Sequence, residues 1–122
     1  MNLATILKEQ KDIVITRSTY EFERVAVLAT KYTVTQHDKQ ILETVEHRNA
    51  SGIIGCLLYI NGVFIMDYVA GEKARRAIYS EVEKLYNIYN GNNDKKVARK
   101  LQSEKNKVYS RVQEVLNSQL SR

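Results

Sequence analysis

Few side chains in this chain of 122 residues have the types and spacing that catalysis or metal binding requires. Cys56 is the only cysteine and the two histidines are His37 and His47, so no set of ligands has the spacing of a zinc site. No Ser/His/Asp triad, paired carboxylates or phosphate-binding glycine pattern is recognisable. We therefore expect a protein that is not an enzyme and holds no metal.

Two side chains with reactive groups lie in apolar surroundings. Cys56 lies in the run Ile53 to Ile60 and is expected to pack as a small hydrophobe. Asp67 lies in the run Val63 to Val69, where an isolated buried carboxylate would be costly. Asp67 is therefore expected to be paired, solvated at an edge, or part of a contact site.

The dipeptide Asn61-Gly62 separates these two runs and predicts a hairpin, because both residues tolerate the positive φ of a two-residue type I′ turn. In this register Tyr59 faces Phe64, and Cys56 faces Asp67. Both faces of the hairpin are apolar, although a two-layer fold buries only one. The second face is the predicted protein-binding surface, with these residues: Cys56, Leu58, Ile65 and Asp67.

The positive charge is concentrated near the C-terminus. The net charge is +5; residues 1–93 hold 11 Lys and Arg against 11 Asp and Glu, and residues 94–122 hold 8 against 3. Such a segment can neutralise phosphates, which makes nucleic-acid binding an alternative function, or it can be a solvated face. The candidate residues are Lys95, Lys96, Arg99, Lys100, Lys105, Lys107 and Arg111.

Hydrophobic periodicity predicts the other central elements. Val25 to Thr30 has the composition of a strand buried on both faces, and Thr35 to Asp38 has a capping-box arrangement that predicts a helix to about Arg48. The apolar positions of that helix are Ile41, Leu42 and Val45. After Gly71, a second helix is predicted with one apolar stripe, followed by a loop at residues 90–94. The stripe consists of Ala74, Ile78, Val82 and Leu85.

The two ends of the chain are less regular. Asn2 could cap a short helix to about Glu9, and residues 12–17 have the β-branched content of a strand or an extended arm, followed by a polar link at 18–24. The tail fits two strands up to about Glu114, or a helix with Val108, Val112 and Leu116 on one face. We favour the strands because of the family pattern that follows.

The order strand, helix, hairpin, helix and two strands is the ferredoxin-like βαββαββ arrangement. Together with the sequence RNASGIIGCLLYINGVF, this arrangement resembles the BLUF domain, a flavin-binding blue-light sensor. The matching positions are Arg48-Asn49, Gly52-Ile53, Gly55, Leu57-Leu58-Tyr59, Phe64 and Gly71. The resemblance implies an α+β sandwich over residues 25–114, with an N-terminal helix and arm at 1–24 and a tail at 115–122.

The residues that perform the family's photochemistry are replaced in this chain. The resemblance places Leu28 at the position of the family's tyrosine and Met66, or Asp67, at that of its glutamine, whereas Asn49 keeps the flavin-contacting asparagine. Leu28 and Met66 are expected to fill the groove between the helices. We therefore expect no bound FAD, and a flavin-binding light sensor is the third alternative.

The expected function is that of a regulatory or inhibitory module that binds another protein and also forms homo-oligomers. The absence of proline and the abundance of Asn, Lys, Ile and Tyr fit an AT-rich gene of a low-GC bacterium, a virus or a mobile element. No apolar run is long enough to span a membrane, and the charged N-terminus does not have the pattern of a signal peptide. A cytoplasmic protein without a membrane partner is expected.

Overall fold

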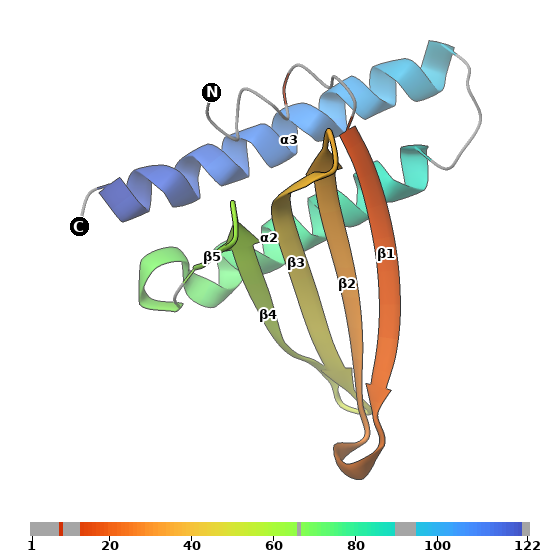
Figure 1. The fold of residues 1–122 in the computed structure, drawn as a ribbon, viewed down its shortest axis with the longest axis vertical. Helices are drawn as coiled ribbons and strands as arrows, with labels where there is room; N and C mark the ends of the chain where they lie inside the picture. The colour runs from red at the N-terminus through yellow and green to blue at the C-terminus, as the bar shows by residue number, and fades with distance from the viewer. Residues whose placement is uncertain (1–7, 9–12, 66, 90–94, 121–122) are drawn as a thin grey trace.

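The chain folds into one antiparallel sheet and two long helices, an α+β arrangement (Figure 1). The computed structural model describes residues 8, 13–65, 67–89 and 95–120. The elements are β1 (Ile13–Phe22), η1 (Glu23–Val25), β2 (Val27–Gln36), β3 (Lys39–Asn49), β4 (Gly52–Ile60), β5 (Val63–Phe64), α2 (Asp67–Tyr89) and α3 (Lys95–Leu120). The strands lie in the sheet in their order along the chain, so four long strands and the two-residue β5 form a meander.

One face of the sheet packs against α2, and α3 packs alongside α2 in the opposite direction (Figure 1). Tyr32 on β2 lies on this face, because its ring meets those of Tyr79 and Tyr86 on α2, with centroids 5.4 Å apart in both pairs. Since side chains alternate along a strand, the residues at even spacing from Tyr32 share its face. They include Val34 on β2 and, opposite Tyr32 on β3, Thr44, both fully buried.

The predicted stripe of α2 is confirmed. Ile78, Val82 and Leu85 are buried and Ala74 packs against the same core, since these positions recur on one side of a helix. The helix begins at Asp67, earlier than expected, and Gly71 (φ 70°, ψ 151°) interrupts its helical geometry. Because this combination of a positive φ with an extended ψ is accessible almost only to glycine, Gly71 allows the chain to change direction there.

The Asn61-Gly62 turn is confirmed, with φ values of 51° and 80° and the expected pairs Tyr59–Phe64 and Ile60–Val63. The prediction of a second hairpin strand from Val63 to Val69 is wrong beyond Phe64. β5 has only two residues, and the chain enters α2 at Asp67. Cys56 therefore pairs with Glu46 on β3 and not with Asp67.

The helix expected from Thr35 to Arg48 is wrong. His37 and Asp38 have φ values of 52° and 63° and form a two-residue turn, so β2 and β3 make a second hairpin. The polar residues that suggested a helix cap are turn residues. Val25 to Thr30 is also not a strand buried on both faces, since Val25 lies exposed in η1 and Leu28 is exposed on β2.

The strands expected in the tail are wrong, and the helical alternative is correct. Val108, Val112 and Val115 are buried at spacings of four and three, which is the packing stripe of α3. The element order therefore differs from βαββαββ, because β3 replaces the first helix and α3 the last strands. The expected helix at Asn2–Glu9 and the loop at 90–94 lie outside the described residues, apart from Lys8.

Residues on both sides of the expected boundaries of the central domain contact one another. The predicted extended arm is the edge strand β1, which is longer than expected and pairs with β2 over its whole length, from Ile13–Gln36 to Phe22–Val27. At the other boundary, Val115 belongs to the same hydrophobic core as Ile15. The described residues thus share one sheet and one core.

Candidate functional site

The end of the sheet that carries η1 extends beyond both helices (Figure 1). The register joins Phe22 to Val27, Leu28 to Arg48 and Arg48 to Ile53, so the ends of four strands meet there. Six of the eight large exposed hydrophobic side chains among the described residues lie at this end, with exposures from 37% to 65%. We call these six residues the sheet tip: Tyr20, Phe22, Val25, Leu28, Ile53 and Ile54.

Aromatic rings gather on the face of the tip that is turned away from α2. Tyr20, Ala29 and His47 form one row across β1, β2 and β3. The Phe22 ring meets Tyr20 edge-on at 5.3 Å and stacks on His47 at 6.2 Å. The fully buried Ala29 lies between the flanking rings, because a methyl group leaves room for them. The result is a half-exposed aromatic surface on strands that hold it in place.

A recess of about 360 Å³ lies at the same end, where β1 passes through η1 into β2. Its lining residues are Glu21, Phe22, Glu23, Ala26, Val27 and Leu28. Ala26 has a left-handed conformation (φ 52°) and its N–H donates to the carbonyl of Glu23 at 3.4 Å, which turns the chain tightly. The recess combines an apolar wall with two carboxylates, and its lining includes no Ser, Cys or His nucleophile.

A second recess of about 270 Å³ lies between the sheet and α2, and it is polar. Its lining residues are Arg17, Thr19, Leu28, Thr30, Tyr32, Glu46, Arg48, Tyr79 and Glu83. These groups largely satisfy one another. The Tyr32 hydroxyl donates to Glu83 at 3.5 Å, Arg48 lies 3.2 Å from Glu46, and the Arg17 guanidinium lies 4.8 Å from the Tyr86 ring centroid.

Burial keeps the tyrosines of this recess protonated. It raises the pKa of the Tyr32 and Tyr79 hydroxyls above the ordinary value, since the phenolate would lose its hydration. The pKa of Arg17 is also raised, mainly by its hydrogen bond with Tyr32. Groups of this kind donate hydrogen bonds and do not act as bases at neutral pH. The recess joins α2 to the sheet and shows no arrangement of nucleophile and base.

The predicted protein-binding surface of the hairpin is not at the surface. Cys56, Leu58 and Ile65 are at most 2% exposed and lie in the core beneath α2, because β5 is too short to present a second apolar face. Burial raises the pKa of the Cys56 thiol to about 11, so it stays protonated. Asp67 begins α2, and its side chain lies outside the described residues.

Leu28 and Asn49, two of the flavin positions implied by the BLUF resemblance, lie on strands of the sheet and not between the helices. Leu28 is exposed at the tip, and Asn49 ends β3, where its Oδ1 accepts a 2.8 Å hydrogen bond from the N–H of Ser51. Met66 lies outside the described residues. Asn49 therefore orders the turn between β3 and β4.

The basic candidates on α3 whose side chains are described are in part buried or beside acidic groups. Lys105 is buried and donates to the carbonyl of Lys8 at 3.0 Å, whereas Arg99 and Lys100 are exposed. Lys107 lies 3.3 Å from Glu104, and the exposed Arg111 contacts the carboxylates of Glu81 and Glu114 at 3.6 and 3.4 Å. The side chains of Lys95 and Lys96 lie outside the described residues.

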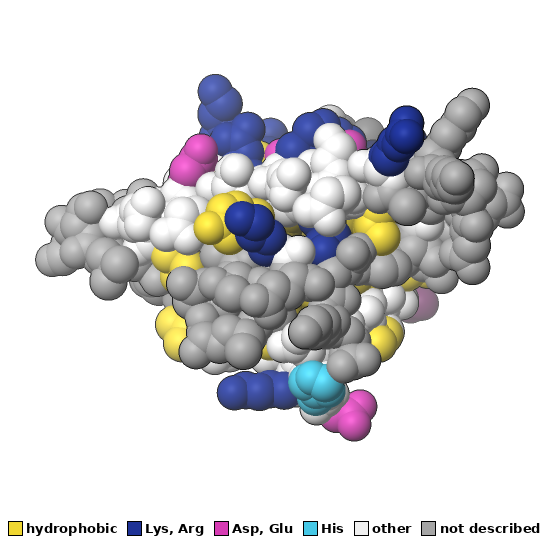
Figure 2. Space-filling model, turned by 90° about the horizontal axis from the view of Figure 1, so that it is seen from above, with side chains coloured by type: hydrophobic (Ala, Val, Ile, Leu, Met, Phe, Trp, Pro, Cys, Tyr) yellow, Lys and Arg dark blue, Asp and Glu magenta, His cyan; other side chains and the backbone are white. Residues whose placement is uncertain are grey.

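In the view of Figure 2, Lys and Arg side chains are spread over several places with acidic side chains among them. The described helices include none that is long and apolar enough to cross a membrane. In the same part of the chain, no three His, Cys, Asp or Glu side chains gather as a metal site would require.

Sequence reasoning missed the aromatic surface of the tip. The signal was the alternation in residues 16–22, where Thr16, Ser18, Tyr20 and Phe22 occupy one face of a strand. The expectation of a polar link at residues 18–24 is therefore wrong up to Phe22, where β1 ends. The polar recess has no local signal, because residues from strands and a helix that are distant in the sequence line it. The chain matches no protein-family model, no curated protein and no solved structure.

Proposed function

We propose that this protein is a non-catalytic regulatory module that binds another protein with its sheet tip. The observation that supports this function is the gathering of six exposed hydrophobic side chains at an end of the sheet that no described helix covers. Exposed hydrophobic side chains that gather in one part of a soluble protein mark an interaction site more often than those scattered singly over its surface.

The composition of the tip favours a protein partner with apolar side chains. Tyrosine and phenylalanine are enriched at the centres of protein interfaces, and burial of one such ring stabilises a complex by about 1.5–3 kcal/mol. The strands fix Tyr20 and Phe22, and the Phe22 ring is also held against His47. Little conformational entropy is therefore lost when a partner covers these rings.

Photo-crosslinking in the native cell tests this function. A photoreactive phenylalanine is placed at Phe22 or Ile54 in the tip, and at Val14 or Val63, which are equally exposed apolar positions away from it. The expected result is a crosslinked protein at the two tip positions and none at the two controls. Equal crosslinking at all four positions, or none at the tip, would overturn the proposal.

The crosslinked protein is then purified and its affinity measured by calorimetry. We expect Phe22→Ser and Ile54→Ser each to weaken binding by about tenfold or more, because each removes one buried apolar side chain from the contact. Val14→Ser is the matched control and should leave the affinity unchanged. Unchanged affinity in both tip variants would show that the tip is not the binding surface.

A further inference from the structure

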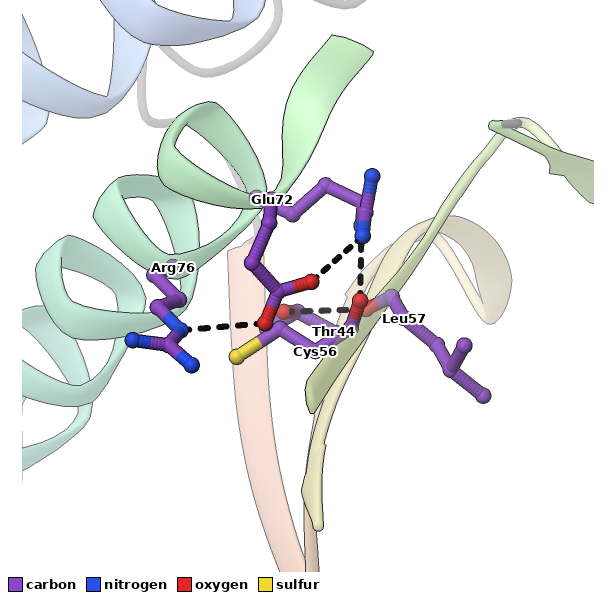
Figure 3. Close-up of polar contacts among 6 residues, drawn as sticks. Thr44, Cys56, Leu57, Glu72 and Arg76 are labelled. Atoms are coloured by element: carbon purple, nitrogen blue, oxygen red, sulfur yellow. Dashed lines mark hydrogen bonds and ion pairs between the residues drawn. The ribbon is translucent and has the colours of Figure 1, made fainter. Parts of the chain in front are cut away.

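The two edges of the sheet differ in how their backbone groups are used. At the β4 edge, β5 pairs with Tyr59 and Ile60, and the N–H of Ile65 donates to the carbonyl of Leu58 at 2.8 Å. Further along, Nε of Arg75 donates to the carbonyl of Cys56 at 2.7 Å (Figure 3). The carbonyls of alternate residues on β4 are therefore occupied, so this edge cannot accept another strand there.

The β1 edge has no such protection within the described part of the chain. β1 runs for ten residues, pairs with β2 on one side, and pairs with no described strand on the other. Its sequence, IVITRSTYEF, contains no proline, and its two charged residues, Arg17 and Glu21, have opposite signs, so they do not exclude a second copy of the same strand. A regular strand of this length presents unused N–H and C=O groups to a second strand.

We propose that two copies of this chain pair antiparallel along β1, with Thr19 of one copy opposite Thr19 of the other. In a pair with two-fold symmetry, residues of the same parity must face each other so that both sheet faces continue across the junction. Among such registers within β1, the one centred on Thr19 alone places Arg17 opposite Glu21, and it does so twice.

The charges select this register over its neighbours. A shift to a centre at Ser18 places Arg17 opposite Thr19 and Glu21 opposite Ile15, so neither charge has a partner. A centre at Arg17 places two like charges against each other. Opposite charges that face each other across strands stabilise the pair, and like charges destabilise it. Glu21 is exposed and Arg17 lies at the surface over the Tyr86 ring, so both are placed to contact a neighbouring strand.

This pairing also joins the aromatic surfaces of the two copies. Tyr20 and Phe22 lie on the face turned away from α2, and in the register centred on Thr19 they stand opposite Ser18 and Thr16 of the second copy. Their rings project from the sheet and remain uncovered in the pair. The joined sheet therefore presents four aromatic rings on one face, whether or not the tip binds a further protein.

A charge-exchange experiment with the full-length purified chain tests the register. In a pair of Arg17→Glu chains the new carboxylates face Glu21, and in a pair of Glu21→Arg chains the new guanidinium groups face Arg17. Each variant alone should therefore raise the dimer dissociation constant by at least about tenfold. In a mixture of the two variants, both contacts again join a carboxylate to a guanidinium. Sedimentation equilibrium should show a concentration-dependent dimer for the natural chain and for the mixture, but not for either variant alone.

Arg99→Glu and Glu114→Arg, the same charge changes at exposed positions of α3, are the controls and should leave dimerisation unchanged. Because Arg17 also contacts Tyr86, circular dichroism establishes whether Arg17→Glu is folded. If it is not, the exposed Glu21→Arg decides alone. A natural chain that is monomeric up to millimolar concentration, or a dimer that Glu21→Arg does not weaken, would overturn the proposal. Because no other protein is present, this result is independent of the crosslinking result.

Discussion

Arg75 on α2 donates a 2.7 Å hydrogen bond through Nε to the backbone carbonyl of Cys56 on β4. The Arg75 side chain is 3% exposed, and its second nitrogen lies 2.5 Å from a carboxylate oxygen of Glu72. As Figure 3 shows, Glu72 also binds Arg76 at 3.0 Å. A buried guanidinium thus joins the first regular turn of α2 to the middle of the β4 edge.

Replacement of Arg75 by methionine should destabilise the protein by about 1.5–3 kcal/mol, since it removes a hydrogen bond from a charged donor and leaves the Cys56 carbonyl without that donor. Urea unfolding followed by circular dichroism measures the change. Arg76→Met is the matched control, because Arg76 shares Glu72 but is half exposed, and its loss should cost at most about 0.5 kcal/mol. Equal costs for both variants would show that the bond to Cys56 contributes nothing.

A substitution at Leu58 tests whether this side chain lies in the core or on a contact surface. The side chain is fully buried beneath α2, so Leu58→Ala should cost about 2–5 kcal/mol of unfolding free energy. Leu57, the next residue on β4, points to the other face and is only partly buried, so Leu57→Ala should cost clearly less. A loss under about 1 kcal/mol for Leu58→Ala would instead fit the exposed, partner-binding position that the hairpin sequence suggested.

A substitution at Asp38, in the turn between β2 and β3, can increase the stability of the protein. Its φ of 63° is unfavourable for a residue with a Cβ atom, so Asp38→Gly should stabilise the protein by about 0.5 kcal/mol despite the greater freedom of glycine in the unfolded chain. Gly62 occupies the same place in the turn between β4 and β5. There a Cβ atom would meet nothing within 4 Å, so Gly62→Ala should cost about 1 kcal/mol through conformation alone.

Thermal unfolding of the two turn variants checks both signs. A lower midpoint for Asp38→Gly, with an unchanged midpoint for Gly62→Ala, would contradict the positive φ values at these turns.

The sequence predicted elements whose signals are local. Asn61-Gly62 specifies its turn by backbone conformation, and the stripe from Ala74 to Leu85 specifies α2 by spacing, so both were found. His37-Asp38 forms the same kind of turn without Asn-Gly, and Thr35 before it gave the pattern of a helix cap. The strand forms there because of tertiary packing, since β3 pairs with strands on both sides and Leu42 and Thr44 are fully buried.

The candidate site was harder to predict than the fold. The tip depends on how far the strands extend beyond the helices, which is a property of the packed structure and has no signal in any one segment. Tyr20 and His47 are far apart in the sequence and lie in one row across the sheet only because Ala29 pairs with both. A sequence pattern could have indicated β1 up to Phe22, but not which residues of β2 and β3 would lie in the same rows across the sheet.

Lys105 should make stability depend on pH in the alkaline range. Burial lowers its pKa from 10.5 to about 8, since the ammonium group loses hydration and receives one hydrogen bond acceptor, the Lys8 carbonyl. Between pH 8 and 10.5 the unfolded state binds more protons at this site than the folded state. The contribution of Lys105 to the unfolding free energy therefore rises with pH in this window, and its full cost is present below about pH 8.

Lys105→Met removes this titration, so the variant should be more stable than the natural chain at about pH 7 by about 1–3 kcal/mol, and the difference should shrink as the pH approaches about 9.5. Urea unfolding at half-unit steps of pH measures it, and subtraction of the two curves cancels the shared contribution of the tyrosines. Lys107→Met, at a half-exposed position beside Glu104, is the control and should show no such trend. A difference between Lys105→Met and the natural chain that stays constant from about pH 7 to about 9.5 would show that Lys105 does not titrate in this range.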